Sequence, residues 1–236
     1  MAHRQGALAL HATFELTRPW TVLFGPSGSG KTTVLRAIAG LMRPAAGRIV
    51  LHGSTTTTLF DSAAGISLPA HLRGVRLAAQ VAALFPHMTV RQNVAYGVPA
   101  PSTDIAEEAL QRFRLTELAG SLPWKLSGGE RQRVAVARAA ASAITVKSGL
   151  LLLDEPFAGL HLPLRDELLE ELRGWLAESR TPVLSVTHDV GEAFQLGAEV
   201  IKFADGRVLQ QGPVEVVLAE ERARLMDQLS RTTAPK

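Results

Sequence analysis

The sequence contains no cysteine, so neither a disulfide framework nor a cysteine-ligated metal site is available to this chain. The lack of cysteine favours a reducing compartment, and the cytoplasm is the simplest one that fits. The chain also lacks an uninterrupted apolar run of the roughly 18 residues needed to cross a bilayer, and its first residues contain no long apolar stretch of a signal peptide. We therefore expect a protein that does not span a membrane by itself.

Blocks of like charge are absent as well. The net charge is +3, and the lysines and arginines are interspersed with acidic residues. Tails that bind nucleic acids usually gather their basic residues in blocks, so we expect no nucleic-acid partner. The 236 residues are 46% hydrophobic, which suffices for one substantial core with a smaller subdomain packed on it.

Apolar periodicity in the first quarter of the chain predicts strands around one helix. Alternation over residues 8–16 predicts a half-buried strand in antiparallel sheet, and the continuous apolar run 20–24 predicts a strand buried on both faces. Helical spacing follows over residues 34–42, and another short strand is expected at 47–51. The polar run 54–58 shows no helical period and is predicted to be a loop.

The middle of the chain has helical spacing. Asp104 is expected to cap a helix whose third residue is Glu107. Its apolar stripe consists of Ala106, Ala109, Leu110 and Phe113. Strands and helices then alternate, with strands predicted at 150–153 and 183–187 and a helix between them at 163–179. A hairpin over 200–210, turning at an Asp-Gly dipeptide, completes an α/β prediction with parallel strands.

The motif GPSGSGKT at residues 25–32 fits G-x-x-x-x-G-K-[ST] and lies between the buried strand and the helix. Such a loop turns successive backbone N–H groups around phosphate oxygens, and the helix that follows directs its positive dipole end at the same anion. Lys31 would contact the outer phosphates, and the Thr32 hydroxyl would bind Mg²⁺. The candidate nucleotide-binding residues are Gly25, Pro26, Ser27, Gly28, Ser29, Gly30, Lys31, Thr32 and Thr33. The alternative is an ordinary glycine-rich turn with a lysine that faces solvent.

Two further segments become candidate ligand-binding sites when they are considered together with that loop. Asp154 and Glu155 follow a buried strand, and open α/β sheets bind ligands at such strand ends. Asp154 would hold Mg²⁺, and Glu155 would polarise the water that attacks the γ-phosphate. Ser127, with Gly128 and Gly129, precedes another helix and forms a second potential anion site. Taken alone, the acidic pair would more often begin a loop, and the serine would more often be a simple helix cap.

Together these segments resemble the ATPase subunits of ABC transporters. The phosphate loop, LSGGERQR at 126–133 and LLLLDEP at 150–156 occur in that family's order, and LSGGE is the specific element. The resemblance implies a single ABC ATPase domain over residues 1–236, with a phosphate-loop NTPase core of mainly parallel sheet. An N-terminal antiparallel β-subdomain and an inserted α-helical subdomain complete the expected fold. The core is expected at 1–80 and 146–222, the helical subdomain at 81–145 and a tail at 223–236.

The resemblance also assigns roles to single residues. Gln80 is similar to the glutamine that touches the metal and the attacking water, and His188 to the switch histidine that contacts the γ-phosphate and positions Glu155. Catalysis is thus assigned to Glu155, His188 and Gln80, and metal binding to Thr32, Gln80 and Asp154. His161 departs from the family, which usually has aspartate there. The residue that stacks on adenine stays open between Phe14, His11 and neither.

The resemblance implies partners and a location. ATP and Mg²⁺ would bind at the interface of a head-to-tail homodimer, attached to membrane permease subunits at the cytoplasmic side of the inner membrane. A periplasmic or extracellular solute-binding protein would take part indirectly. The stretch 59–76, LFDSAAGISLPAHLRGVR, is similar to importers of molybdate and, more distantly, of sulfate. No regulatory β-domain is expected after residue 210, only a short helical tail. The alternatives are another solute, a non-transport ABC ATPase acting on ribosomes or DNA, and an unrelated phosphate-loop kinase.

Overall fold

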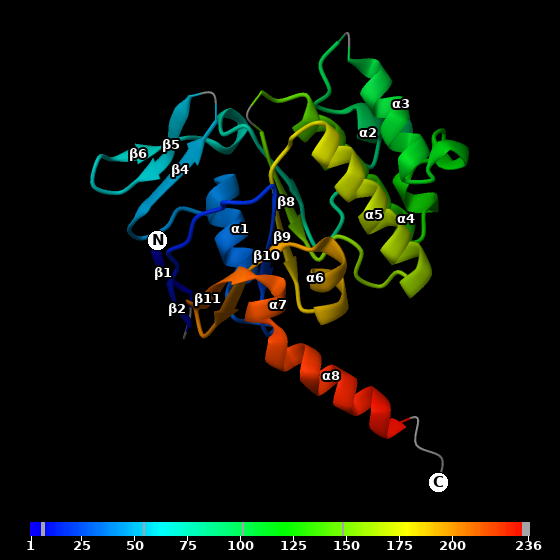
Figure 1. The fold of residues 1–236 in the computed structure, drawn as a ribbon. Helices are drawn as coiled ribbons and strands as arrows, with labels where there is room; N and C mark the ends of the chain where they lie inside the picture. The colour runs from blue at the N-terminus through cyan, green and yellow to red at the C-terminus, as the bar shows by residue number, and fades with distance from the viewer. Residues whose placement is uncertain (6–7, 54, 101, 148, 233–236) are drawn as a thin grey trace.

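The chain is built on an eight-stranded sheet flanked by helices (Figure 1). The computed structural model describes residues 1–5, 8–53, 55–100, 102–147 and 149–232. The strand order is β1-β2-β11-β10-β3-β9-β8-β7. The strands are β1 (Ala2–Gln5), β2 (Leu8–His11), β3 (Trp20–Phe24), β7 (Val75–Ala78), β8 (Leu150–Asp154), β9 (Val183–Thr187), β10 (Glu199–Ala204) and β11 (Arg207–Pro213).

Five neighbouring strands, β10, β3, β9, β8 and β7, run parallel to one another. The remaining strands, β1, β2 and β11, lie at one side of the sheet, where β1 pairs with β2 and β11 with β10 in antiparallel orientation. Parallel strands end at the same edge of a sheet, so the loops that follow β3, β7, β8 and β9 emerge together there. This edge is where the phosphate loop, Gln80, the acidic pair and His188 are gathered.

The central strands read as continuous apolar runs because both faces of the sheet are covered. In β8, Leu151 and Leu153 pack into one apolar cluster, while Leu150 and Leu152 pack into the other. The cluster on one face includes residues of α3, α4, α5 and α6, and the cluster on the opposite face is closed by α1. Successive side chains of a strand point to opposite faces, so a strand buried twice carries apolar residues at every position.

The helices are α1 (Lys31–Ala39), α2 (Val90–Ala95), α3 (Thr103–Arg112), α4 (Gly128–Ile144), α5 (Leu162–Glu178), α6 (Val190–Leu196), α7 (Val214–Val217) and α8 (Ala219–Thr232). Three short 3₁₀ helices lie at Ala70–Leu72, Thr116–Leu118 and Pro123–Lys125. Helices α2, α3 and α4 pack on one another at one end of the molecule, and α8 projects from the body at the other (Figure 1). None of the described helices combines the length and apolar character that a membrane crossing requires.

An aromatic cluster connects the helical region to the strand edge. Phe113 follows α3, and its ring lies 6.4 Å from Phe157, in the loop after β8, and 6.3 Å from Trp175 of α5. Arg112 adds ion pairs to Glu108 and Glu171 and lies over the Trp175 ring. All three rings are buried. The loop that carries the acidic pair is therefore packed directly against the helices.

The polar run at 54–58, expected to be a loop, is mostly strand, and that prediction was wrong. A separate three-stranded antiparallel sheet contains β4 (Arg48–His52), β5 (Thr56–Asp61) and β6 (Ile66–Ser67). Thr56 and Thr57 pair with His52 and Leu51 of β4, and both threonines are exposed. Threonine favours strands through its branched Cβ. An exposed run of threonines has no apolar alternation to reveal it, and Ser54 lies outside the described residues.

Three boundaries also differ from the sequence predictions. Helix α1 ends at Ala39 because Gly40 adopts φ 79° as its left-handed cap, so the helical spacing up to residue 42 extended too far. The residue before α3 is Ser102, and Asp104 lies in the first turn without serving as the cap. The N-terminal strand pairs only as far as His11, although Leu10 and Ala12 are buried and His11 and Thr13 exposed, as the alternation predicts.

Candidate active site

The phosphate-loop motif forms the connection between β3 and α1. Gly28 and Gly30 have φ angles of 79° and 102°, which side chains other than glycine rarely adopt. A Cβ on Gly25 would lie 1.9 Å from the Phe203 carbonyl oxygen of β10. The loop is thus shaped by glycines where the backbone turns and where it meets the neighbouring strand.

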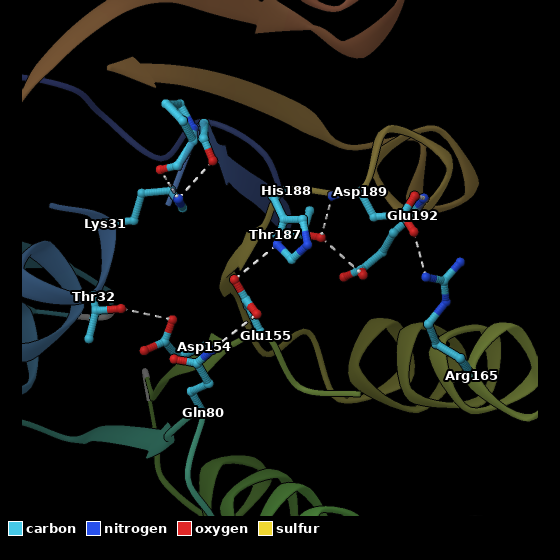
Figure 2. A network of polar contacts seen from close by, with 12 residues as sticks. Lys31, Thr32, Gln80, Asp154, Glu155, Arg165, Thr187, His188, Asp189 and Glu192 are labelled. Atoms are coloured by element: carbon cyan, nitrogen blue, oxygen red, sulfur yellow. Dashed lines mark hydrogen bonds and ion pairs between the residues drawn. The ribbon is translucent and has the colours of Figure 1, made fainter. Parts of the chain in front are cut away.

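Lys31 is folded back over this loop, as Figure 2 shows. Its Nζ donates hydrogen bonds to the carbonyl oxygens of Gly25, at 2.7 Å, and Pro26, at 2.8 Å. Burial lowers the pKa of Lys31, while Glu155 and Asp154 raise it in part. A buried ammonium group beside the N-terminus of a helix attracts an anion strongly.

The loop fits a phosphate group on observations independent of the motif. The Ser29 hydroxyl is buried without a hydrogen-bond partner among the described residues, although nearly all buried polar atoms in proteins have one. Helix α1 begins at Lys31 with no acidic residue in its first turn. A phosphate oxygen placed here would accept hydrogen bonds from the Ser29 hydroxyl and from the amides at the start of α1.

Asp154 and Thr32 form the pair expected to hold a cation. The Thr32 Oγ1 donates to Asp154 Oδ1 at 3.2 Å, and Asp154 is 3% exposed. Burial raises the pKa of Asp154, and the hydrogen bond from Thr32 lowers it. The negative charge of the neighbouring Glu155 raises it further. A hydroxyl oxygen and a buried carboxylate are hard donors of the kind that Mg²⁺ prefers, so these two residues fit that ion.

Glu155 lies between Gln80 and His188 (Figure 2). Gln80 Nε2 donates to Glu155 Oε2 at 3.2 Å, and the His188 Nδ1 lies 3.0 Å from Glu155 Oε1. The Glu155 backbone adopts φ 49°, a conformation uncommon for residues other than glycine and often found at functional sites. Three strand ends, those of β7, β8 and β9, thus converge on a single carboxylate.

The contacts of Ser127 do not join the LSGGE segment to Glu155, Gln80 and His188. Ser127 caps α4 by accepting a hydrogen bond from the Glu130 amide, and the Glu130 carboxylate accepts from the Ser127 amide. These bonds are local, and they leave Gly128 and Gly129 at the helix start. A Cβ on Gly129 would lie 2.6 Å from Leu160, in the loop after Glu155. Within one chain, the segment packs beside the acidic loop, and the hydrogen bonds described for Ser127 go to Glu130 and Arg131 of its own helix.

His161, the departure from the family pattern, has a local role here. Its Nδ1 accepts a hydrogen bond from the Leu164 amide at 3.4 Å and so caps helix α5. An aspartate at a helix N-cap makes the same bond and adds a favourable charge. The substitution therefore preserves the helix start and removes a negative charge from the loop.

Sequence reasoning missed a second layer of residues beneath His188. Thr187, Asp189 and Glu192 form hydrogen bonds with one another, and Arg165 of α5 contacts Asp189 Oδ2 at 2.5 Å (Figure 2). Helix α6 itself was not predicted, although the sequence Asp-x-x-Glu at 189–192 is a usual helix-start signal. The signal was present and could have located Asp189 as a cap.

Comparison with known proteins agrees with this geometry. The sequence model of the family described as ABC transporter matches residues 13–158, more than half of the chain. The chain belongs to the ABC transporter family. Its ATP-binding cassette fold is shared with the cassette MJ0796, solved as a dimer bound to ADP and Pi, with a TM-score of 0.72 and 26% identity over 90% of this chain and 95% of that one.

Curated relatives of this ABC transporter chain carry molybdenum in their names. A molybdenum import ATP-binding protein ModC from Mesorhizobium japonicum is 41% identical over 94% of this chain and 61% of the relative. A molybdate/tungstate import ATP-binding protein WtpC from Archaeoglobus fulgidus is 37% identical over 96% of this chain and 91% of the relative. The chain spans about three-fifths of the length of the first two ModC relatives, 61% and 58%.

The buried Glu192 predicts a pH-dependent term in stability. Burial raises its pKa from 4.5 to about 7, so the folded state keeps a proton that the unfolded state releases between these values. This term is fully favourable below the unfolded pKa and is lost as pH rises through 7. Relative to Glu192→Gln, the wild type should lose about 3 kcal/mol of stability between pH 4.5 and 7.5.

Thermal or urea unfolding at several pH values measures this difference. Glu170→Gln, at an exposed position on α5, serves as the control and should follow the wild type at every pH. A constant stability difference between wild type and Glu192→Gln across the range would show that Glu192 titrates normally.

Proposed function

We propose that this chain is the ATP-hydrolysing subunit of an importer that takes up molybdate through a membrane permease. The observation that carries the proposal is the Glu155 carboxylate, hydrogen-bonded by Gln80 and His188 beside Lys31 and Asp154. This arrangement matches the needs of phosphoryl transfer to water, which are electrostatic stabilisation and a positioned base. The names of the molybdenum-import relatives support the choice of cargo.

Each residue has a role that follows from its place. Bound MgATP supplies the phosphoanhydride bond and the divalent cation. Lys31 and the loop amides would bind the phosphates, and Thr32, Asp154 and Gln80 would hold the cation. Glu155 orients a water molecule and accepts its proton as oxygen attacks phosphorus. Gln80 and His188 fix the direction of the Glu155 side chain, which limits the loss of rotamer freedom during the reaction.

A second subunit completes the site in this proposal. The Ser127 hydroxyl and the amides of Gly128 and Gly129 would close over the nucleotide bound by a partner chain, in a head-to-tail homodimer. The dimeric cassette MJ0796 supports such an assembly. The dimer would be attached at the cytoplasmic face of the inner membrane to permease subunits, and only indirectly to a solute-binding protein.

Glu155→Gln should abolish hydrolysis and spare nucleotide binding. The amide keeps the size of the carboxylate and an oxygen that can accept the hydrogen bond from Gln80, but it cannot accept the proton from water. We expect phosphate release to fall by about 10²-fold or more, while the affinity for a fluorescent ATP analogue stays within twofold. Glu170→Gln is the matched control at an exposed site. Turnover at the wild-type rate in Glu155→Gln would remove the base from the mechanism.

Lys31→Ala should weaken ATP binding itself. The variant loses the buried ammonium group and its charge-assisted contacts, worth about 1.5–3 kcal/mol, so the dissociation constant should rise by about 10- to 100-fold. Equilibrium binding of the fluorescent analogue measures this change. Lys147→Ala, which alters an exposed lysine before β8, should bind as wild type does. Equal affinity in Lys31→Ala would refute the phosphate-loop assignment.

The cargo is tested in the complex reconstituted with its permease and solute-binding protein in liposomes. Molybdate should stimulate ATP turnover, and tungstate, an oxyanion of the same charge and tetrahedral shape, should do so as well. Sulfate should give much weaker stimulation at equal concentration. Stimulation by sulfate alone would overturn the cargo and leave the ATPase assignment intact.

A further inference from the structure

Glu192 is a buried carboxyl group that the chemistry described above does not use. Glu192 is 6% exposed and lies on α6, directly behind the strand end that carries His188 (Figure 2). Its Oε2 accepts a hydrogen bond from the Thr187 hydroxyl at 3.1 Å, and its Oε1 is buried without a hydrogen-bond partner among the described residues. A buried carboxyl group with one free oxygen is costly, so its presence requires a reason.

The hydrogen bonds around Glu192 form a modified helix cap. Asp189 is the N-cap of α6, and its Oδ1 accepts from the Glu192 amide at 3.1 Å. In an ordinary capping box the side chain of the third helical residue would return this bond to the N-cap amide. Here the Asp189 amide donates to the Thr187 hydroxyl instead, at 3.1 Å, and that hydroxyl donates to Glu192. The Thr187 hydroxyl of the preceding strand therefore lies between the two partners of the capping box, the Asp189 amide and the Glu192 carboxyl group.

Two other helices of the chain show the ordinary form. Thr89 and Gln92 at the start of α2 exchange hydrogen bonds directly, and so do Ser127 and Glu130 at the start of α4. Neither box involves a residue before its cap. The Thr187 hydroxyl at the start of α6 therefore adds a connection that capping alone does not need.

That connection encloses His188. The Thr187 hydroxyl binds the amide two residues later, so the backbone on both sides of His188 is tied to Glu192. Arg165 fixes Asp189 from α5, through Nη1 and Oδ2 at 2.5 Å. The His188 ring then leaves this turn toward Glu155, at 3.0 Å, although its side chain is 59% exposed. An exposed ring keeps one direction only if its backbone is firmly anchored.

We propose that Glu192 is a positioning residue for ATP hydrolysis, which sets the His188 imidazole against Glu155 through the hydroxyl of Thr187. The inference rests on the proposed ATPase function. It adds to the proposed site a residue that acts only through the Thr187 hydroxyl and the turn at His188. The charged groups that act on Glu192 are Arg165 of α5, Asp189 at the turn and Glu155 at the end of β8. Burial raises the pKa of Glu192 to about 7, which permits the uncharged form beside two other carboxylates.

The test compares four variants of the full chain by steady-state ATP hydrolysis. Glu192→Ala removes the acceptor of the Thr187 hydroxyl and should lower kcat at least 10-fold, with KM for ATP within twofold of wild type. Glu192→Gln retains an oxygen that accepts the same bond and should keep at least half of the wild-type kcat. Thr187→Val should reproduce the loss, and the double variant Glu192→Ala/Thr187→Val should lose no more than either single variant.

Gln92→Ala provides the matched control, because it removes the corresponding side chain from the ordinary capping box of α2. It should lower the unfolding temperature without lowering kcat. A second readout uses the protein without nucleotide: the ¹⁵N signals of the His188 ring report its contact with Glu155. These signals should move toward free-histidine values in Glu192→Ala and stay in place in Glu192→Gln and Gln92→Ala.

Several outcomes would overturn the inference. One is an unchanged kcat in Glu192→Ala, and another is a loss expressed in KM with kcat preserved. Additive losses in the double variant, or unmoved His188 signals in Glu192→Ala, would also end it. Failure of the proposed function is a separate result, because wild type would then not hydrolyse ATP at all while the His188 signals would still test the contact.

Discussion

Parallel pairing of β7, β8, β9 and β3 is the constraint on which the site depends. It brings Gln80, Glu155, His188 and the phosphate loop to one edge, although they are spread over most of the sequence. The apolar runs that specify these strands are buried on both faces, so sliding one strand by a single residue would exchange its two core faces. The stability of the core and the geometry of the acidic pair therefore have the same origin.

The same edge is connected outward on two sides. Phe157, two residues after Glu155, packs on Phe113 and so on the helical region. On the other side, Arg165 of α5 contacts Asp189 just beyond His188. Helix α5 is thus joined to the loop that follows Glu155 through its cap, His161, and to the turn that follows His188 through Arg165, its fourth residue. A displacement of α5 would act on both partners of one hydrogen bond, between Glu155 and His188.

Much of this was predictable from sequence, and the failures have physical causes. The buried strands at 20–24, 150–153 and 183–187 were confirmed because continuous apolar runs between turn signals leave few alternatives. The strand at Thr56–Asp61 was missed because exposed threonines carry no apolar period. Gln80 and His188 were assigned by resemblance, and their convergence on Glu155 needed the strand order. The only sequence signal at Glu192 was that of a helix start, because a hydrogen bond between a buried hydroxyl and a carboxyl group leaves no periodic pattern in the sequence.

The charge balance at this edge explains why a buried carboxyl group can lie behind the candidate site. The ends of β8 and β9 and the start of α6 bring together four carboxyl groups, those of Asp154, Glu155, Asp189 and Glu192. The cations that act on Asp154 and Glu192 are Lys31, Arg36 and Arg165. Burial raises the pKa of both Asp154 and Glu192, and the pKa of about 7 at Glu192 reduces the negative charge that the fold must accommodate near neutral pH. Glu192 lies behind the strand end that carries His188, where it accepts a hydrogen bond from Thr187 and interacts electrostatically with Glu155. The protonated form of Glu192 therefore relieves repulsion with Glu155, and a carboxyl oxygen remains available to the Thr187 hydroxyl in either protonation state.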